Sequence, residues 1–393
     1  MNTETIQKPE TTKTPRTVGR WFRLCPVRHI LTLCGAGLIG VYFLLRGNPA
    51  VMAAVSGGFV RPFHRAAARL TGPLPFSLAE ALIVAGVLAA LGYLAVFIVG
   101  LIRRRERAKR VYRLLLTALC AFTLLYGGFC LFWGVYYYTS DFEARSGIQT
   151  APVRTQQLET VTRYFTDLLN HYARSVRRDE NGVFAEPRAE YFSRSAALYE
   201  NAARLVPCLA GDAVPAKPFF FSYFMSCVDF TGFYFPFTGE ANINVHAPGC
   251  LIPSTIAHEQ AHQRGVAQED EANFCAVLAS LESGDPVYCY SACLLAYIHL
   301  GNALYTADHD AWADNYARLA PEVRADLAEN NAYWARFRTP VANVSNSVYT
   351  GFLQSYGQTL GLQTYGKCVD LLVTYYYDRS AAALSGAFQA GNP

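Results

Sequence analysis

Three long runs of uncharged, mostly apolar residues in the first 140 positions constrain the fold of this 393-residue chain more than any other feature. They cover residues 30–45, 81–102 and 114–138. About 20 residues of α-helix cross a bilayer core of about 30 Å, so the second and third runs are long enough to span it. The first run is shorter and could instead be the apolar core of a cleaved signal peptide. We favour a true span, because no cleavage site stands out, and therefore expect three transmembrane helices.

The distribution of basic residues predicts how these spans are oriented. Six Lys or Arg residues precede the first run, seven lie in the short loop 103–113 and four in the longer loop 46–77. Cytoplasmic loops are enriched in Lys and Arg, which places the segment 1–29 and the loop 103–113 in the cytoplasm. Residues 141–393 would then form an extracytoplasmic domain. This topology signal explains the basic clusters better than a nucleic-acid patch does, so we expect a bilayer and no nucleic acid as partner.

The extracytoplasmic part has the pattern of a mostly helical α+β domain. A short alternation of apolar and polar residues at Ala241–Val245 is typical of a half-exposed strand and predicts a small sheet. The apolar stretch from Tyr288 to Leu300 is too short to span a membrane and is expected to be a buried helix. Helical spacing of apolar residues predicts helices over 155–176, 189–205, 268–283, 288–305, 309–318, 321–337 and 366–377.

The sequence His258-Glu259-Gln260-Ala261-His262 is the motif with the most specific chemistry. On a helix, histidines at i and i+4 lie on one face about 6 Å apart, so they can share one zinc ion. Glu259 can reach the open position of that ion without being a ligand, as the general base of a metallopeptidase does. Pro253 and Gly265 stand where such a helix would begin and end.

A catalytic zinc ion needs a third protein ligand, and three acidic residues follow the motif closely. If a helix begins near Gln268, Glu271 shares the apolar face of Phe274 and points inward with it. We therefore expect Glu271 to be the third ligand, with Glu269 as the next candidate and Asp270 as the last. A three-histidine site is not expected, because Gln268 stands at the position of the third histidine.

The strand just before the motif is a candidate for substrate binding. An extended peptide can add to an exposed sheet edge through backbone hydrogen bonds, which places Ala241, Asn242, Ile243 and Asn244 in that role. The alternative is that this strand only completes the sheet. Four residues are candidates for stabilising an oxyanion, and the sequence does not rank them: His246, Tyr234, His299 and Tyr349.

The blocks at 233–245, 258–267 and 269–274 resemble a bacterial family of membrane proteins that is catalogued as a domain of unknown function. The resemblance implies N-terminal membrane helices joined to a zincin-like extracytoplasmic domain, in a multi-pass protein of the bacterial cell membrane. The Glu-Ala-Asn-x-x-Ala pattern of residues 271–276 is also similar to the third-ligand helix of other two-His-one-Glu peptidases, which supports Glu271.

We therefore expect a membrane-anchored, zinc-dependent metallopeptidase that cleaves peptides or proteins with metal-activated water and Glu259 as general base. The alternative is a non-enzymatic zinc-binding sensor or scaffold. A structural site has no use for the base Glu259, which favours the enzyme. Intramembrane proteolysis is disfavoured because the residues that surround the motif are too polar for a bilayer.

Overall fold

A computed structural model describes residues 17–103, 106–356 and 366–386 of the chain. The described chain divides into two compact units, of which the first contains Met1–Leu44 and Leu88–Leu131 and the second Leu45–Val87 and Phe132–Pro393. Five of the basic residues used for the orientation lie outside the described residues: Lys8, Lys13, Arg16, Arg104 and Arg105.

The first unit contains most of three helices that are long and apolar enough to cross a membrane: α2 (Pro26–Leu45), α5 (Leu78–Ile102) and α6 (Arg107–Phe132). Residues 78–87 of α5 belong to the second unit. A short helix, α1 (Thr17–Leu24), precedes them. Because α2 begins four residues earlier than the apolar run, it reaches 20 residues, the length that a span needs. The third predicted span ends earlier than expected, at Phe132.

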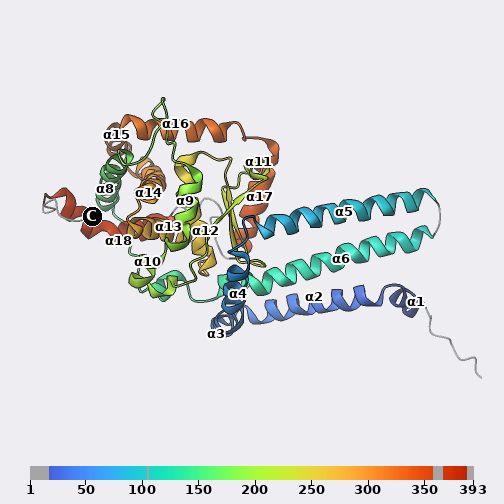
Figure 1. Cartoon of the computed structure of the whole chain (residues 1–393). Coiled ribbons are helices and arrows are strands. Elements are labelled where there is room, and N and C mark those ends of the chain that lie inside the picture. Colours follow the sequence, from blue (N-terminus) through green and yellow to red (C-terminus); the bar gives the residue numbers. More distant parts are fainter. Residues whose placement is uncertain (1–16, 104–105, 357–365, 387–393) are drawn as a thin grey trace, which may run out of the picture. The chain divides into compact units, whose positions relative to one another are not determined.

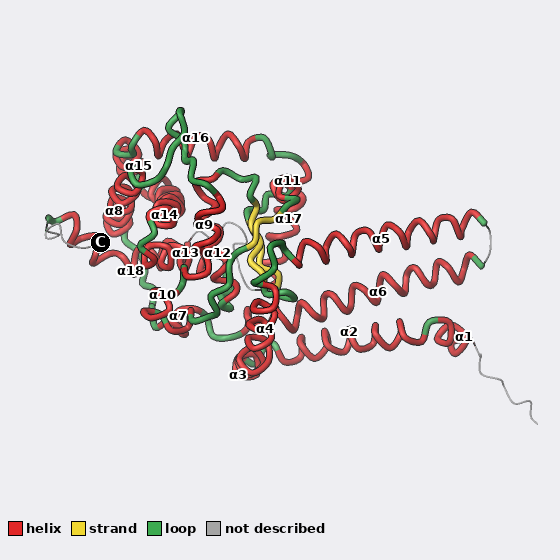
Figure 2. Tube along the Cα trace, in the orientation of Figure 1, coloured by secondary structure: helices red, strands yellow, loops and turns green. Residues whose placement is uncertain are grey.

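The second unit is mostly helical and contains one small sheet, as the sequence predicts (Figure 2). The helices that precede the sheet or connect its strands are α3 (Pro49–Val55), the π-helix η1 (Ser56–Val60), α4 (Arg61–Thr71), η2 (Gly134–Tyr138), α7 (Phe142–Ser146), α8 (Thr155–Ala173), α9 (Arg188–Arg194), η3 (Ser195–Ala197), α10 (Glu200–Leu205), η4 (Pro207–Leu209) and α11 (Ser222–Cys227). Those that follow the sheet are η5 (Gly249–Leu251), α12 (Ile252–Gln263), α13 (Glu269–Ser283), α14 (Pro286–Ala307), α15 (His309–Ala317), α16 (Pro321–Ala335), α17 (Pro340–Ser355) and α18 (Gly366–Leu384).

The sheet has three strands in the order β1 (Lys217–Phe219), β3 (Glu240–Asn244), β2 (Gly232–Phe235). The central strand β3 runs parallel to β1 and antiparallel to β2, and all five of its residues are buried. The expectation of a half-exposed strand is therefore wrong. Its polar side chains have partners inside the protein: Asn242 accepts from Ser77 and Asn244 donates to the carbonyl oxygen of Phe230.

Helix α14 lies in the core of the second unit, packed against α8, α13 and α18 (Figure 1). It is apolar enough to be a candidate span by composition, but 78% of its most apolar window is buried inside the unit. This agrees with the buried helix expected between Tyr288 and Leu300. Its apolar residues on all sides reflect a position between other helices rather than contact with lipid.

The central strand also holds the first turn of α5. The Glu240 carboxylate accepts hydrogen bonds from the backbone N–H groups of Leu78 (3.0 Å) and Ala79 (2.8 Å), which have no partner within a helix. Glu80 in the same turn accepts from the N–H groups of Phe220 and Phe221, just after β1. These bonds explain why residues 45–87 belong to the second unit, although we expected that domain to begin at residue 141.

Replacing Glu240 with alanine should destabilise the second unit. The change leaves two buried N–H groups without an acceptor and removes a negative charge from a helix N-terminus, at a cost of about 1.5–3 kcal/mol. We expect a lower midpoint of thermal unfolding for the full chain in detergent, and a smaller loss for Glu240→Gln. Glu159→Ala, at an exposed position on α8, is the matched control. Equal midpoints for Glu240→Ala and the control would contradict this role.

Candidate metal centre

The motif helix α12 lies against the sheet and against α13. Proline stands in its first turn, where a missing N–H costs nothing, and Gly265 follows its end with a φ of 77°. The helix is therefore bounded as the sequence predicts. Its packing face includes Ile256, Ala257 and Ala261, which are fully buried.

The two histidines of α12 are oriented by hydrogen bonds at Nδ1. His258 Nδ1 lies 2.8 Å from Asn273 Oδ1, and His262 Nδ1 lies 2.6 Å from the carbonyl oxygen of Val266. The rings are perpendicular, with centroids 4.7 Å apart. Because Nδ1 is engaged in both rings, Nε2 is the nitrogen that each presents to a common point, as metal-binding histidines usually do.

The acidic residue at that common point is Glu269, the first residue of α13. Its Oε2 lies 3.1 Å from His258 Nε2, and its Oε1 lies 3.8 Å from His262 Nε2. One ligand atom from each of the three residues can be chosen so that all lie within 4.8 Å of one another. Two imidazoles and one carboxylate are a donor set that catalytic zinc sites use.

The structure does not bring Glu271, the expected third ligand, to this set of side chains. Glu271 accepts a hydrogen bond from the backbone N–H of Phe142 (3.1 Å) and pairs with Lys367 Nζ (3.1 Å). Nearly every residue of α13 from Asp270 to Ser280 is buried, so the apolar periodicity did not identify the face toward α12. The smaller face of Glu269 and Asn273 is the one that faces the histidines.

Glu259 lies beside this cluster and is almost completely buried, with 4% of its surface exposed. Its Oε2 has no hydrogen-bond partner among the described residues. Burial raises the pKa of Glu259, although the neighbouring histidines act in the opposite direction. The carboxylate reaches this place because Gly232 on β2 has no side chain: a Cβ there would lie 2.7 Å from Glu259 Oε1.

The charged groups of the cluster shift one another's pKa values. Burial alone would lower the pKa of His262, but the adjacent Glu269 raises it to about 9. Burial alone would likewise raise the pKa of Glu269, but hydrogen bonds from His258 and His262 lower it well below its usual range. The carboxylate thus stays ionised, and the negative potential that holds a proton on His262 would also attract a divalent metal ion.

The predicted substrate residues Ala241, Asn242, Ile243 and Asn244 are not available for an extended peptide. They belong to the central strand β3, whose two edges are paired with β1 and β2. The sheet edge next to Glu259 is that of β2, where the backbone N–H of Tyr234 interacts with the Glu259 carboxylate. The sequence did not indicate this, because β1 was not anticipated and β3 was taken for an edge.

Of the four oxyanion candidates, Tyr349 is brought to the cluster by α17: its hydroxyl donates to Glu269 Oε1 (2.8 Å). His246 instead lies 2.7 Å from the Tyr333 hydroxyl, through Nδ1. His299 is buried in α14, where burial lowers its pKa to about 4. The ring of Tyr234 packs against Trp133 rather than the two histidines.

Aromatic residues after α6 form a further wall of the site. Trp133 packs its ring perpendicular to that of His262, with centroids 5.5 Å apart. Trp133, Tyr136 and Tyr137 are all buried in the second unit. They therefore belong to the core of the second unit, although the apolar run 114–138 was expected to be one span. An aromatic cluster at the end of an apolar run can equally well be the start of a core.

A family model described as "Protein of unknown function (DUF3810)" matches residues 56–373. Comparison with curated proteins and with solved structures found no significant match. The matched range contains all of the residues of the cluster.

Because Glu259 lies close to Gly232, replacing Gly232 with alanine should have the opposite effect on stability from replacing Gly351. Gly232→Ala should displace the buried carboxylate and lower stability by about 1–3 kcal/mol, as overpacking does. Gly351→Ala, in α17 with no atom within 4 Å of the new Cβ, should instead raise stability by about 0.5–1 kcal/mol. Thermal unfolding midpoints of the two variants measure both effects. A Gly232→Ala variant as stable as the natural chain would contradict the close approach.

Proposed function

The chain belongs to the family described as "Protein of unknown function (DUF3810)", and we propose that it is a membrane-anchored, zinc-dependent peptidase with a zincin-like catalytic domain. The observation that carries the proposal is the convergence of His258, His262 and Glu269 beside a buried carboxylate oxygen of Glu259 that has no partner among the described residues. A general base, rather than a structural residue, accounts for that oxygen.

The residues present fit a zinc ion. His258 and His262 would bind it through Nε2 and Glu269 through a carboxylate oxygen, which leaves one tetrahedral position open, as in catalytic sites. Asn273 and the carbonyl oxygen of Val266 fix the two rings from behind, a support that metal-binding histidines commonly have. When bound, the ion would supply Lewis-acid chemistry, polarising a carbonyl oxygen and acidifying water.

In this proposal Glu259 moves the proton. Its carboxylate accepts a proton from the attacking water and donates it to the leaving amine. Burial, which raises its pKa, brings the carboxylate closer to the range in which it can do both. Tyr349 holds Glu269 in place and has a hydroxyl close enough to the cluster to donate to an oxyanion.

The edge of β2 supports a peptide as substrate. Among the described residues β2 pairs with β3 alone, so the outward-facing backbone groups of Gly232 and Tyr234 are directed away from the sheet. An extended chain added at this edge would lie beside Glu259. We further propose that α2, α5 and α6 span the bilayer with the N-terminus in the cytoplasm, which makes the second unit extracytoplasmic.

The metal content of the purified full-length chain tests the ligand set. We expect roughly one zinc ion per chain, lost in His262→Ala and in Glu269→Gln. Glu271→Gln should keep the ion, because Glu271 pairs with Lys367 instead. Asn273→Ala should lower the affinity for zinc about 10–100-fold by releasing the His258 ring. Loss of zinc in Glu271→Gln with retention in Glu269→Gln would reverse the assignment.

The role of Glu259 is tested by hydrolysis of a mixed peptide library, followed by mass spectrometry. Glu259→Gln keeps the shape of the side chain but cannot accept a proton, so we expect cleavage to fall about 10²–10⁴-fold while zinc remains bound. The control is Glu322→Gln, at an exposed position on α16. Full cleavage by the zinc-bound Glu259→Gln variant would rule out this mechanism. A zinc-bound natural chain that cleaves no peptide would favour the non-enzymatic sensor or scaffold.

A further inference from the structure

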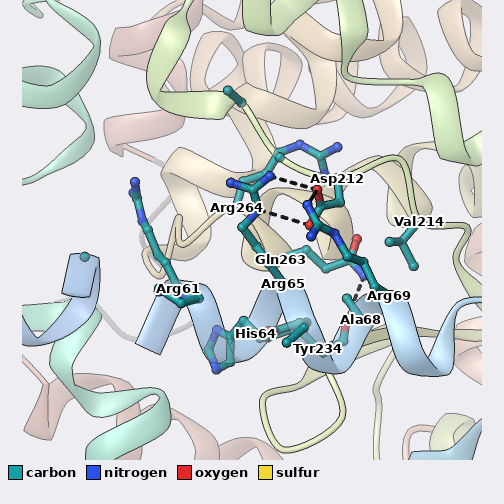
Figure 3. A pocket seen from close by; sticks show the side chains of 16 residues that line it. Arg61, His64, Arg65, Ala68, Arg69, Asp212, Val214, Tyr234, Gln263 and Arg264 are labelled. Atoms are coloured by element: carbon teal, nitrogen blue, oxygen red, sulfur yellow. Dashed lines mark hydrogen bonds and ion pairs between the residues drawn. The ribbon is translucent and has the colours of Figure 1, made fainter. Parts of the chain in front are cut away.

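A second polar site lies in the same unit, in a pocket of about 480 Å³ (Figure 3). Its walls are α4, the segment around Asp212 and the end of α12, with Tyr234 from β2. None of the three residues of the metal cluster lines it. The pocket is large enough for a small organic anion rather than a single water molecule.

Positive charge dominates the lining of the pocket. Four arginines line it, against one acidic residue, Asp212: Arg61, Arg65, Arg69 and Arg264. Four positive charges and one negative charge leave a formal excess of three. His64 also lines the pocket, but burial lowers its pKa to about 4, so it is neutral at pH 7.

Asp212 pairs with only part of this charge. Arg65 donates to both of its carboxylate oxygens, at 3.0 and 2.8 Å, and Arg69 donates to one at 2.7 Å. Figure 3 shows these side chains directed toward Asp212 and Arg61 directed away from it. Within the described chain, Arg61 and Arg264 form no ion pair with any carboxylate.

The side chain of Arg264 is held in one position in the pocket wall by burial, packing and a hydrogen bond. Only 7% of its surface is exposed, and its guanidinium lies 4.1 Å from the centroid of the Tyr199 ring. Its Nη1 donates to the carbonyl oxygen of Gln260 at 2.9 Å. Gly211 permits this packing, since a Cβ there would lie 3.1 Å from Arg264 Cγ.

Three residues that line the pocket each have a buried polar atom with no hydrogen-bond partner among the described residues: Arg264 at Nε, Tyr234 at its hydroxyl and His64 at Nε2. Buried polar groups in native proteins are almost always hydrogen-bonded, so each orphaned atom needs an explanation. Arginine and tyrosine are donors here, which calls for a ligand that accepts hydrogen bonds.

We propose that this pocket binds a phosphate ester anion. Guanidinium groups match the spacing of phosphate oxygens, and their bonds to phosphate are charge-assisted. Arg61 and Arg264 supply the charge that Asp212 does not neutralise. The Tyr234 hydroxyl is an additional donor to the phosphate oxygens.

The position of the arginines in the sequence, between two candidate spans, favours a lipid headgroup as the source of the phosphate. The three arginines belong to the helical segment 49–71, formed by α3, η1 and α4. It begins four residues after the end of α2 and is followed by α5 at Leu78. If α2 and α5 are spans, both ends of the segment are tied to the bilayer surface. A soluble phosphate ester shares the chemistry, and the experiment distinguishes the two.

The test measures binding to the full-length chain in a neutral detergent, by calorimetry, with two probes. These are glycerol 3-phosphate and a short-chain phosphatidylglycerol, compared with a short-chain diacylglycerol that has no phosphate. Arg61→Gln and Arg264→Gln should each weaken binding of a phosphate probe by about tenfold or more, the effect of losing a charge-assisted hydrogen bond. Arg204→Gln, at an exposed position on α10, makes the same change in net charge and should leave binding unchanged.

If both probes bind, the proposal is supported and a soluble phosphate ester is enough for binding. If only the phosphatidylglycerol binds, the proposal is supported and the ligand is a lipid headgroup. Arg264 is buried, so Arg264→Gln could fail to fold. Arg61→Gln loses no ion pair and therefore tests the same proposal in a chain that keeps its fold. The proposal is overturned if neither probe binds. It is also overturned if the diacylglycerol binds as well as the phosphatidylglycerol, or if Arg204→Gln weakens binding as much as Arg61→Gln.

Discussion

The buried carboxylate of Glu240 is the interaction on which the arrangement of the second unit depends. From the central strand it binds two N–H groups at the start of α5, and Thr238 donates to it as well. The same strand supports α12, the helix that carries the histidines. One strand of the second unit therefore contacts both the first turn of α5 and the helix that carries His258 and His262.

The sequence predicted well those features that depend on local periodicity or on a fixed spacing. The candidate spans, the buried α14 and the ends of α12 each follow from a pattern within one segment. The pairing of strands could not be predicted, because β1 is three residues long and lies far from β3 in sequence. The strand that we expected at an edge, β3, is therefore the central strand, and the edge next to Glu259 is that of β2.

The choice between Glu269 and Glu271 shows a second limit of the same kind. Apolar periodicity identifies the inner face of a helix only if the other face is exposed to solvent. Helix α13 is enclosed on nearly all sides, so both of its faces are buried. Only the contact between Asn273 on α13 and His258 on α12 shows which face lies toward the histidines. Helix α17 was missed for the opposite reason: its apolar residues Val341, Val344 and Val348 are exposed, although it delivers Tyr349 to the cluster.

Tyr234 belongs to both polar sites of the second unit. Tyr234 is one of the residues that line the arginine-rich pocket, while its backbone N–H interacts with the carboxylate of Glu259. If an anion binds in this pocket as proposed, its binding and the protonation of Glu259 influence one another by the same free energy in both directions.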